Sequence, residues 1–277
     1  MLLQLDQTAD TADSLRRLIL DALDDILRAA AKPDDDRARH IRLDVKRIRS
    51  YLRLLRDALG EKRFKKENRL FRDFSRPFGQ LRNHEVLEST LNLLESCLKP
   101  ADNLQLRALF SNKITRPDPT DFGFVMISVT AAQQRFAVPL EAPVRLPSRL
   151  KQLYRNGRRL FKLTRRQPET DNLHEWRKEA KYLRYALATV EEAGPDDATW
   201  RKRLKKLTKI IGKHHDLSLL HDLLQDMPDA PPEALPAIAT LQQTLTDQAL
   251  DLGARLYDRK PRAFITSLNG TYRQHSA

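Results

Sequence analysis

LHEWRKEAKYLRYALATV, residues 173–190, is the most informative stretch of the sequence, because it carries two different stripes of side chains. The apolar stripe recurs at steps of four, three, four and three, as expected for an amphipathic helix: Trp176, Ala180, Leu183, Leu187 and Val190. Roughly 125° around the helix lies a basic stripe, at about 100° per residue. Its members are His174, Arg177, Lys178, Lys181 and Arg184. A merely solvated face usually mixes charges of both signs, so this sorting indicates a functional surface.

The same two stripes occur earlier in the chain, between residues 39 and 59. Its apolar residues are Ile41, Val45, Ile48, Leu52, Leu55 and Leu59, and its basic residues are Arg39, Arg42, Lys46, Arg49 and Arg53. A shift of 135 residues, the separation of Arg39 and His174, superimposes both stripes. Because solvated faces have no reason to keep their charges in register, we interpret the pattern as an internal duplication that preserves a basic surface.

A second pair of helices, predicted over residues 61–78 and 197–211, repeats the pattern at a shift of 133 residues. The shift places Phe71, Phe74 and Phe78 on Leu204, Leu207 and Ile211, and it places Arg69, Arg72 and Arg76 on Lys202, Lys205 and Lys209. Gly79 and Gly212 stand where each helix is expected to end. Arg82 and His215 follow them, and we expect both to contact an anion near a helix terminus.

The composition favours a helical protein with an anionic partner. Of 277 residues, 40% are hydrophobic, 31% are charged and only 8 are glycine. The formal net charge of +13 points to nucleic acid, a phosphorylated polymer or an anionic membrane face. The single Cys97 fits a reducing compartment, and neither a secretory signal nor an apolar stretch long enough to span a membrane is evident. We therefore expect a cytoplasmic protein.

The rest of the chain fits two repeats, predicted over residues 1–146 and 147–277. Residues 11–30 form an acidic first helix, and residues 99–148 are hard to read, although a helix is favoured over 122–136. Residues 149–166 form a helix whose basic face, which includes Arg155, Arg158 and Arg159, lies opposite its apolar face. The first repeat lacks this charge, so the basic surface should be asymmetric. A long helix is expected over residues 237–259.

These segments resemble the CHAD domain, the conserved histidine α-helical domain. The resemblance is carried by LHEWRKEAKYLRY at 173–185 and by its weaker copy at 39–60. It is also carried by LYRNGRRLF at 153–161, IIGKHHDLSLL at 210–220 and LGARLYDRKPRAF at 252–264. It implies an all-α fold of two four-helix bundles, related by a pseudo-twofold axis around a basic central cleft, which binds inorganic polyphosphate without catalysis. In one departure, Arg39 takes the position of His174, and His40 points off the stripe.

Rows of Arg and Lys at repeated spacing suit a linear polyanion, because residues seven apart on a helix are separated by about 10 Å. The predicted polyphosphate-binding residues are Arg39, Arg42, Lys46, Arg49, Arg69, Arg72, Arg76, Arg82, Arg155, Arg158, Arg159, His174, Arg177, Lys181, Arg184, Lys202, Lys205, Lys209 and His215. We expect no metal, no cofactor and no catalytic residue. The expected partners are polyphosphate itself, polyphosphate-metabolising enzymes and granule proteins.

Nucleic-acid binding and metal-dependent phosphohydrolysis are the two alternatives to polyphosphate binding. A nucleic-acid binder shares the charge, but it usually adds aromatic stacking platforms, and aromatic residues make up only 6% of the chain. We expect nucleic acid to bind only non-specifically, through its phosphates. A metal-dependent phosphohydrolase is suggested by His214, His215 and Asp216, but no carboxylate cluster accompanies them.

Overall fold

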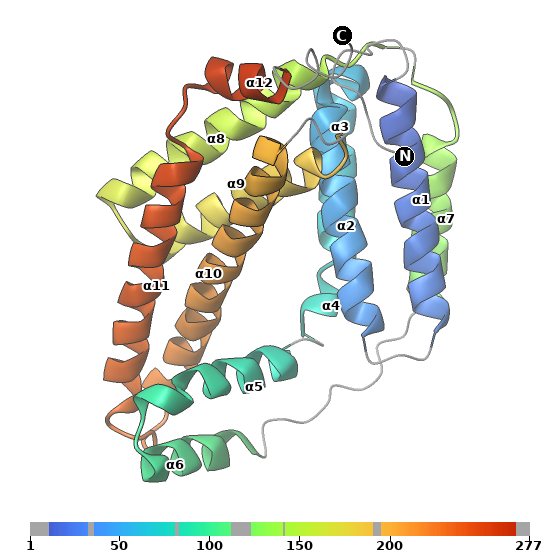
Figure 1. Ribbon diagram of the computed structural model, residues 1–277. Coiled ribbons are helices and arrows are strands. Elements are labelled where there is room, and N and C mark those ends of the chain that lie inside the picture. The colour runs from blue at the N-terminus through green and yellow to red at the C-terminus, as the bar shows by residue number, and fades with distance from the viewer. Residues whose placement is uncertain are drawn as a thin grey trace.

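The computed structural model describes residues 11–32, 36–80, 83–111, 123–140, 142–190 and 195–269 and shows an all-α fold (Figure 1). One group of helices packs together in the first half of the chain: α1 (Thr11–Ala31), α2 (Arg37–Leu54), α3 (Arg56–Phe74) and α7 (Gly123–Phe136). A second group packs together in the second half: α8 (Leu146–Arg166), α9 (Thr170–Leu187), α10 (Pro195–Gln225), α11 (Ala234–Leu256) and α12 (Pro261–Asn269). The pseudo-twofold relation and the boundary between residues 146 and 147 remain predictions.

The short helices α4 (Pro77–Gln80), α5 (Asn83–Leu94), η1 (Glu95–Cys97) and α6 (Pro100–Ser111) come between α3 and α7 in the chain. Instead of staying with the first group, α5 packs against α10. On α6, the Gln105 amide donates a hydrogen bond to the carbonyl of Asp229, at 3.0 Å. Residues of the first half thus form part of the surface of the second group, below α10 in Figure 1.

Both predicted apolar stripes are buried. On α9, Trp176, Ala180 and Leu183 are fully inaccessible to solvent, and the stripe that begins with Ile41 on α2 is equally buried. The two helices meet at Ser50, whose hydroxyl donates to the carbonyl of Tyr182 at 2.9 Å. Burial of one face fixes the rotation of each helix about its axis, so the neighbouring basic stripe must face outward from the core.

Two predicted helix boundaries need correction. The predicted helix over residues 61–78 ends at Phe74, and α4 begins at Pro77, because proline lacks the N–H group that would continue the helix. In the second half α10 runs without a break from Pro195 to Gln225, so Gly212 lies inside a helix and not at its end. In addition, the helix predicted over residues 39–59 ends at Leu54, and α3, which begins at Arg56, contains a kink at Gly60, whose φ is 69°.

The helix predicted over residues 122–136, which competed with a strand, is confirmed as α7. Its last turn is held by Arg16 of α1, whose guanidinium donates to the carbonyls of Phe136 at 2.9 Å and Ala137 at 3.3 Å. These carbonyls lack partners within their own helix, because the last turn of a helix leaves its acceptors open. On the other side, Glu67 of α3 is buried and accepts a hydrogen bond from Arg135 at 2.8 Å.

An aromatic core holds the second group together. The rings of Tyr154 and Phe264 stack at 4.2 Å between centroids, and the ring of Trp176 lies 5.5 Å from that of Phe161. Gly253 of α11 allows this approach, since a Cβ added there would lie 2.6 Å from the Trp176 ring and 2.7 Å from the Phe161 ring. The Trp176 ring can therefore occupy this position only because residue 253 has no side chain.

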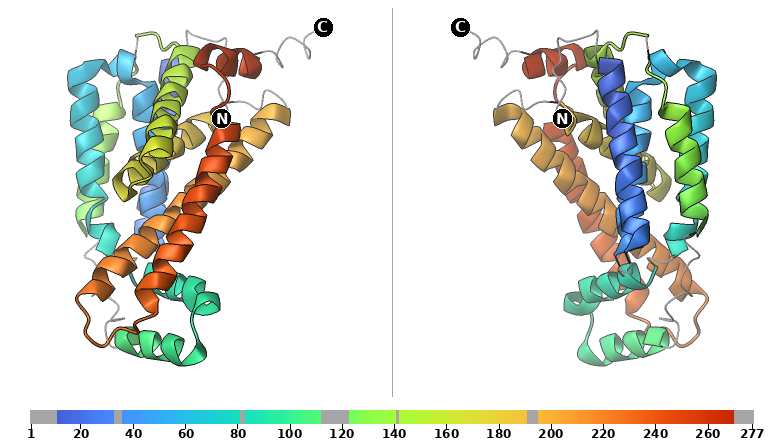
Figure 2. Two further views of the ribbon diagram at one scale, coloured as in Figure 1. Left: turned by 90° about the vertical axis from the view of Figure 1, so that its left-hand side faces the viewer. Right: turned by 90° about the vertical axis from the view of Figure 1, so that its right-hand side faces the viewer.

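Among the described helices, none is both long enough and apolar enough to cross a bilayer. The views of Figure 2 show α1 and α7 toward the viewer on one side of the molecule, and α8 and α11 on the opposite side.

We predict that Gly253→Ala lowers the free energy of unfolding by about 1–3 kcal/mol, because the added methyl group overpacks two buried rings that cannot move aside. Urea unfolding followed by circular dichroism measures the change. The control is Ala254→Leu, which adds a larger group to an exposed position of the same helix and should be close to neutral. Equal or greater stability of Gly253→Ala would contradict the proposed tight seat of Trp176.

Candidate anion-binding site

Arg177 is the best-positioned cation of the predicted stripe. It follows the buried Trp176 in α9, so it projects about 100° away from the core side, toward α10. Its Nε donates a hydrogen bond to the carbonyl of Thr208 at 3.3 Å, which holds the half-buried guanidinium against α10. A backbone carbonyl has no net charge, so this hydrogen bond orients the guanidinium without itself cancelling the positive charge.

Gly212 provides the space into which Arg177 fits. A Cβ at residue 212 would lie 2.9 Å from Nη2 and 3.4 Å from Nε of Arg177. Glycine inside a helix is less favourable than alanine by about 1 kcal/mol, so a buried glycine in the middle of α10 calls for a structural reason. Its close contact with Arg177 supplies that reason and replaces the predicted role of Gly212 as a helix end.

A pocket of about 510 Å³ opens beside these groups, between α9, α10 and α5. We call it the α9–α10 pocket, and it is lined by Ser89, Thr90, Asn92, Leu93, Arg177, Thr208, Lys209, Gly212, Lys213 and Asp216. The cations of the lining are Arg177, Lys209 and Lys213, and its carboxylate is Asp216. The net charge of the pocket is therefore positive. The α5 wall adds the exposed polar side chains of Ser89 and Asn92. Such a pocket suits an anion with several oxygen acceptors, because cations and neutral donors approach it from different elements.

His174 and His215, both predicted site residues, come together where α9 and α10 pack. Their rings lie 4.7 Å apart, and the buried Nδ1 atom of each has no hydrogen-bond partner in the protein. Burial, and then the neighbouring His215, lowers the pKa of His174. Burial, followed by the charge of Arg177, lowers the pKa of His215. Both imidazoles are therefore neutral at pH 7, and each could take up a proton when an anion arrives.

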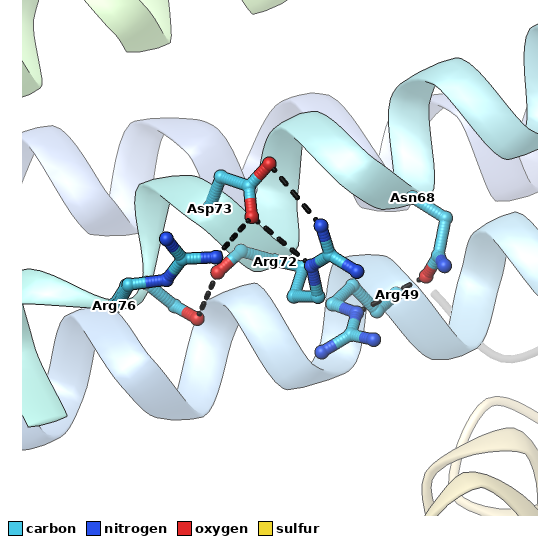
Figure 3. A network of polar contacts seen from close by, with 6 residues as sticks. Arg49, Asn68, Arg72, Asp73 and Arg76 are labelled. Atoms are coloured by element: carbon cyan, nitrogen blue, oxygen red, sulfur yellow. Dashed lines mark hydrogen bonds and ion pairs between the residues drawn. The ribbon is translucent and has the colours of Figure 1, made fainter.

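The first half repeats the carbonyl anchor. Arg42 of α2 donates to the carbonyl of Phe78 at 3.0 Å, much as Arg177 donates to Thr208. Arg49, also on α2, donates its Nε to the Asn68 side chain of α3 at 3.1 Å, as Figure 3 shows. The corresponding stripes in the two halves thus use hydrogen bonds to neutral oxygen atoms to orient cations.

The basic stripe of the first half is partly neutralised. Asp73 accepts hydrogen bonds from Arg72 and Arg76 at 3.0 Å each (Figure 3), and Asp36 lies 3.6 Å from Arg39. The cation bonds lower the pKa of Asp73, so this carboxylate stays ionised. At the shift of 133 residues, Lys206 replaces Asp73 in the second half. The expected asymmetry of charge therefore extends beyond α8 to the duplicated helices themselves.

Four predicted residues belong to α2 and α9, which pack against each other. Arg49 binds Asn68, and Arg184 lies over the Tyr185 ring at 4.6 Å from its centroid. Lys46 and Lys181 are half-buried on the same two helices. That these four residues face one another across a twofold axis remains a prediction.

The remaining predicted residues lie elsewhere. Arg155, Arg158 and Arg159 line a separate pocket on α8 that shares no lining residue with the α9–α10 pocket. Arg69 on α3 and Lys202 and Lys205 on α10 are exposed. Arg82 lies outside the described residues.

Sequence reasoning missed Lys213 and the whole α5 wall of the pocket. Lys213 follows Gly212, whose position predicts a helix end, so the sequence does not place Lys213 on the same helix as Lys209. Ser89 and Asn92 gave no signal, because only the tertiary packing of α5 against α10 brings them to the site.

The comparisons with known proteins agree with this architecture. The CHAD domain family matches residues 14–225 of the chain. The solved structure of PptA from Streptomyces chartreusis superimposes with a TM-score of 0.62 at 18% sequence identity, covering 91% of this chain and 98% of PptA. At that identity the likeness is informative about the fold alone. A search of curated proteins found no match.

We predict that His174 and His215 titrate below the ordinary histidine pKa of about 6.5. Between the lowered folded pKa and the unfolded value, the unfolded chain binds more protons, so these residues make stability fall as the pH decreases below about 6.5. NMR titration measures the pKa values directly. Unfolding at pH 7.5 and 5.5 should show a weaker pH dependence for His174→Asn with His215→Asn than for the unsubstituted protein. An unchanged dependence would contradict the burial of neutral imidazoles.

Proposed function

The chain belongs to the CHAD domain family, and from this premise we propose that it binds inorganic polyphosphate at the α9–α10 pocket. The observation that carries the proposal is Arg177, which is oriented by the Thr208 carbonyl and by the space at Gly212, in a pocket that Lys209 and Lys213 also line. A fixed guanidinium binds phosphate oxygens with little loss of conformational freedom, since its side chain is already ordered.

The lysines of the pocket fit a chain of phosphates. Lys209 and Lys213 are exposed and lie one helical turn apart on α10, about 6 Å along the axis. They can follow successive charges of a linear polyanion from the phosphate seated at Arg177. Lys202 and Lys205 continue the same helix away from the pocket, so the chain can extend along α10.

Nucleic acid fits the site less well. Both tryptophans are buried in the core, Trp176 completely and Trp200 with 4% of its surface exposed. They cannot stack on bases, which contribute much of the affinity of single-stranded nucleic acids. Phosphate contacts alone would then give only weak and non-specific binding.

We also propose that the protein is a non-catalytic binding module. Its role would be regulatory or would place it on polyphosphate granules, with polyphosphate-metabolising enzymes or granule proteins as further partners. Among the described residues, no group of three or more His, Cys, Asp or Glu side chains is arranged to hold a metal ion. The histidine pair is better suited to contact phosphate, because it lies beside Arg177.

The first test compares long-chain polyphosphate with single-stranded DNA and RNA at matched charge concentration and physiological salt. Polyphosphate should bind most tightly, with a steep salt dependence from counterion release. Lys209→Glu with Lys213→Glu should weaken polyphosphate binding by about 10- to 100-fold, because two contacts are lost and repulsion is added in a confined pocket. Fluorescence anisotropy or calorimetry measures both effects.

The matched control is Lys32→Glu with Lys99→Glu, which changes the net charge equally at exposed sites just after α1 and just before α6. Gly212→Ala is a second test variant, since its methyl group would displace Arg177 while improving helix propensity by about 1 kcal/mol. It should lose affinity without losing stability. If the control loses as much affinity as Lys209→Glu with Lys213→Glu, binding depends on net charge alone. Equal or tighter binding of nucleic acid would refute the polyphosphate proposal.

The second test concerns catalysis. Incubation with polyphosphate or tripolyphosphate and Mg²⁺, Mn²⁺ or Zn²⁺ should release no phosphate above a protein-free control. Phosphate release that survives repurification and is abolished in a His215→Ala variant would show that the module is an enzyme.

A further inference from the structure

The outer face of α8 carries an unusual concentration of positive charge. We define this face by Arg155, Arg158, Arg159, Lys162 and Arg166, which line a groove of about 520 Å³ together with Leu163 and Pro261. The apolar side of the helix, including Leu150 and Phe161, is buried in the second group of helices. The five cations therefore project away from the core, and none of the described residues that line the groove is acidic.

These cations lack the carboxylate partners that other arginines have. Within the part of the chain that the structure describes, none of the five forms an ion pair. Arg135 by contrast pairs with Glu67 at 2.8 Å, and Arg149, near the start of the same helix α8, pairs with Asp57 at 3.0 Å. Unpaired like charges at helical spacing repel one another, so the face is destabilised unless an anion occupies it.

The groove also has a fixed element. Arg158 donates its Nε to the carbonyl of Tyr257 at 3.0 Å, which orients its guanidinium at the edge of the groove. This is the same carbonyl anchoring that holds Arg177 and Arg42. Helix α12 begins at Pro261 on the opposite wall, and the N-terminal end of a helix carries a partial positive charge.

The spacing of the face fits an extended ligand. Arg155, Arg159, Lys162 and Arg166 follow one another at steps of four, three and four, and they span about 16 Å along the helix at a rise of 1.5 Å per residue. A compact anion would meet only two or three of these cations. A linear polyanion lying along α8 would meet all of them.

This face is separate from the α9–α10 pocket. Helix α9 packs between α8 and α10, and the two sites share no lining residue. In Figure 1, α8 lies at the top of the second group with α12, whereas α5, which forms one wall of the α9–α10 pocket, lies at the bottom.

We propose that the outer face of α8 is a second polyphosphate-binding site, and that the protein uses its two sites to cross-link polyphosphate chains. The inference rests on the proposed function, because it assigns the same ligand to a second surface. Each molecule holds two stretches of polyanion on different sides of α9. Long chains that bind many such molecules are joined into a network, whereas short chains fill the two sites separately.

Other anionic surfaces match the face less well. A helix that binds membranes places apolar side chains next to its cations so that they enter the bilayer, but the large apolar side chains of α8 are buried or, like Leu163, half-buried. Stacking of nucleic-acid bases needs exposed aromatic rings, but Tyr154 and Phe161 of α8 are both buried. A flexible polyanion without bases needs neither feature.

The test begins with the unsubstituted protein and, in a calorimeter, a polyphosphate chain just long enough to span the cations of the α8 face. We expect two bound chains per molecule. Arg155→Glu with Arg159→Glu should reduce the number to one, and so should Lys209→Glu with Lys213→Glu. Lys32→Glu with Lys99→Glu should leave it at two. Circular dichroism checks that each variant is folded. The stoichiometry of the unsubstituted protein shows without any variant whether there are one or two sites.

Light scattering with long-chain polyphosphate then tests cross-linking. The unsubstituted protein and the surface control should produce turbidity, and each single-site variant should lose it, because a molecule with one site cannot bridge two chains. One bound chain per molecule, or turbidity that persists in Arg155→Glu with Arg159→Glu, would overturn the inference while leaving the proposed function intact. Absence of any polyphosphate binding would instead refute the proposed function.

A further experiment measures binding of the protein to vesicles that contain phosphatidylserine. If the α8 variant loses vesicle binding but binds as much polyphosphate as the unsubstituted protein, the face is assigned to membranes and the inference is wrong.

Discussion

The geometry of the basic surface depends on one packing contact, in which the Trp176 ring lies against Gly253 and Phe161. Once this ring is buried, the rotation of α9 is fixed, and the side chain next to it must point toward α10. Arg177 then reaches the Thr208 carbonyl, and His174 meets His215 at 4.7 Å between ring centroids. The apolar core therefore orients the charged groups as well as stabilising the fold.

Cations of the basic surface are oriented through neutral oxygen atoms as well as through carboxylates. Arg42, Arg158 and Arg177 each donate to a backbone carbonyl, and these bonds orient the guanidinium groups without themselves cancelling their charge. Where carboxylates are used, as at Asp73 between Arg72 and Arg76, the geometry is similar but the local field is weaker. The second half has Lys206 at the position of Asp73, so α10 does not carry the carboxylate that binds Arg72 and Arg76 on α3.

Much of the fold could be predicted from one sequence, and the reasons for the failures are physical. The stripes that begin with Ile41 and Trp176 are buried as predicted, because amphipathic spacing depends only on local geometry. Gly212 was misread, because a glycine next to polar residues suggests a helix end until the guanidinium that occupies its space is known. The packing of α5 against α10 produces no periodic pattern in the sequence, so the α5 wall of the pocket could not be predicted.

That crossing bears on how the two halves work together. Ser89 and Asn92 belong to the first half of the sequence, yet they line a pocket whose cations belong to the second. The half-buried Asp216 of α10 lines the same pocket, so a charged group of α10 and neutral donors of α5 share one ligand space. A fragment that starts at residue 147 would keep Arg177, Lys209 and Lys213 but lose the opposing wall. The two halves of the chain are thus interdependent at the site, because the pocket is completed only when α5 packs on α10.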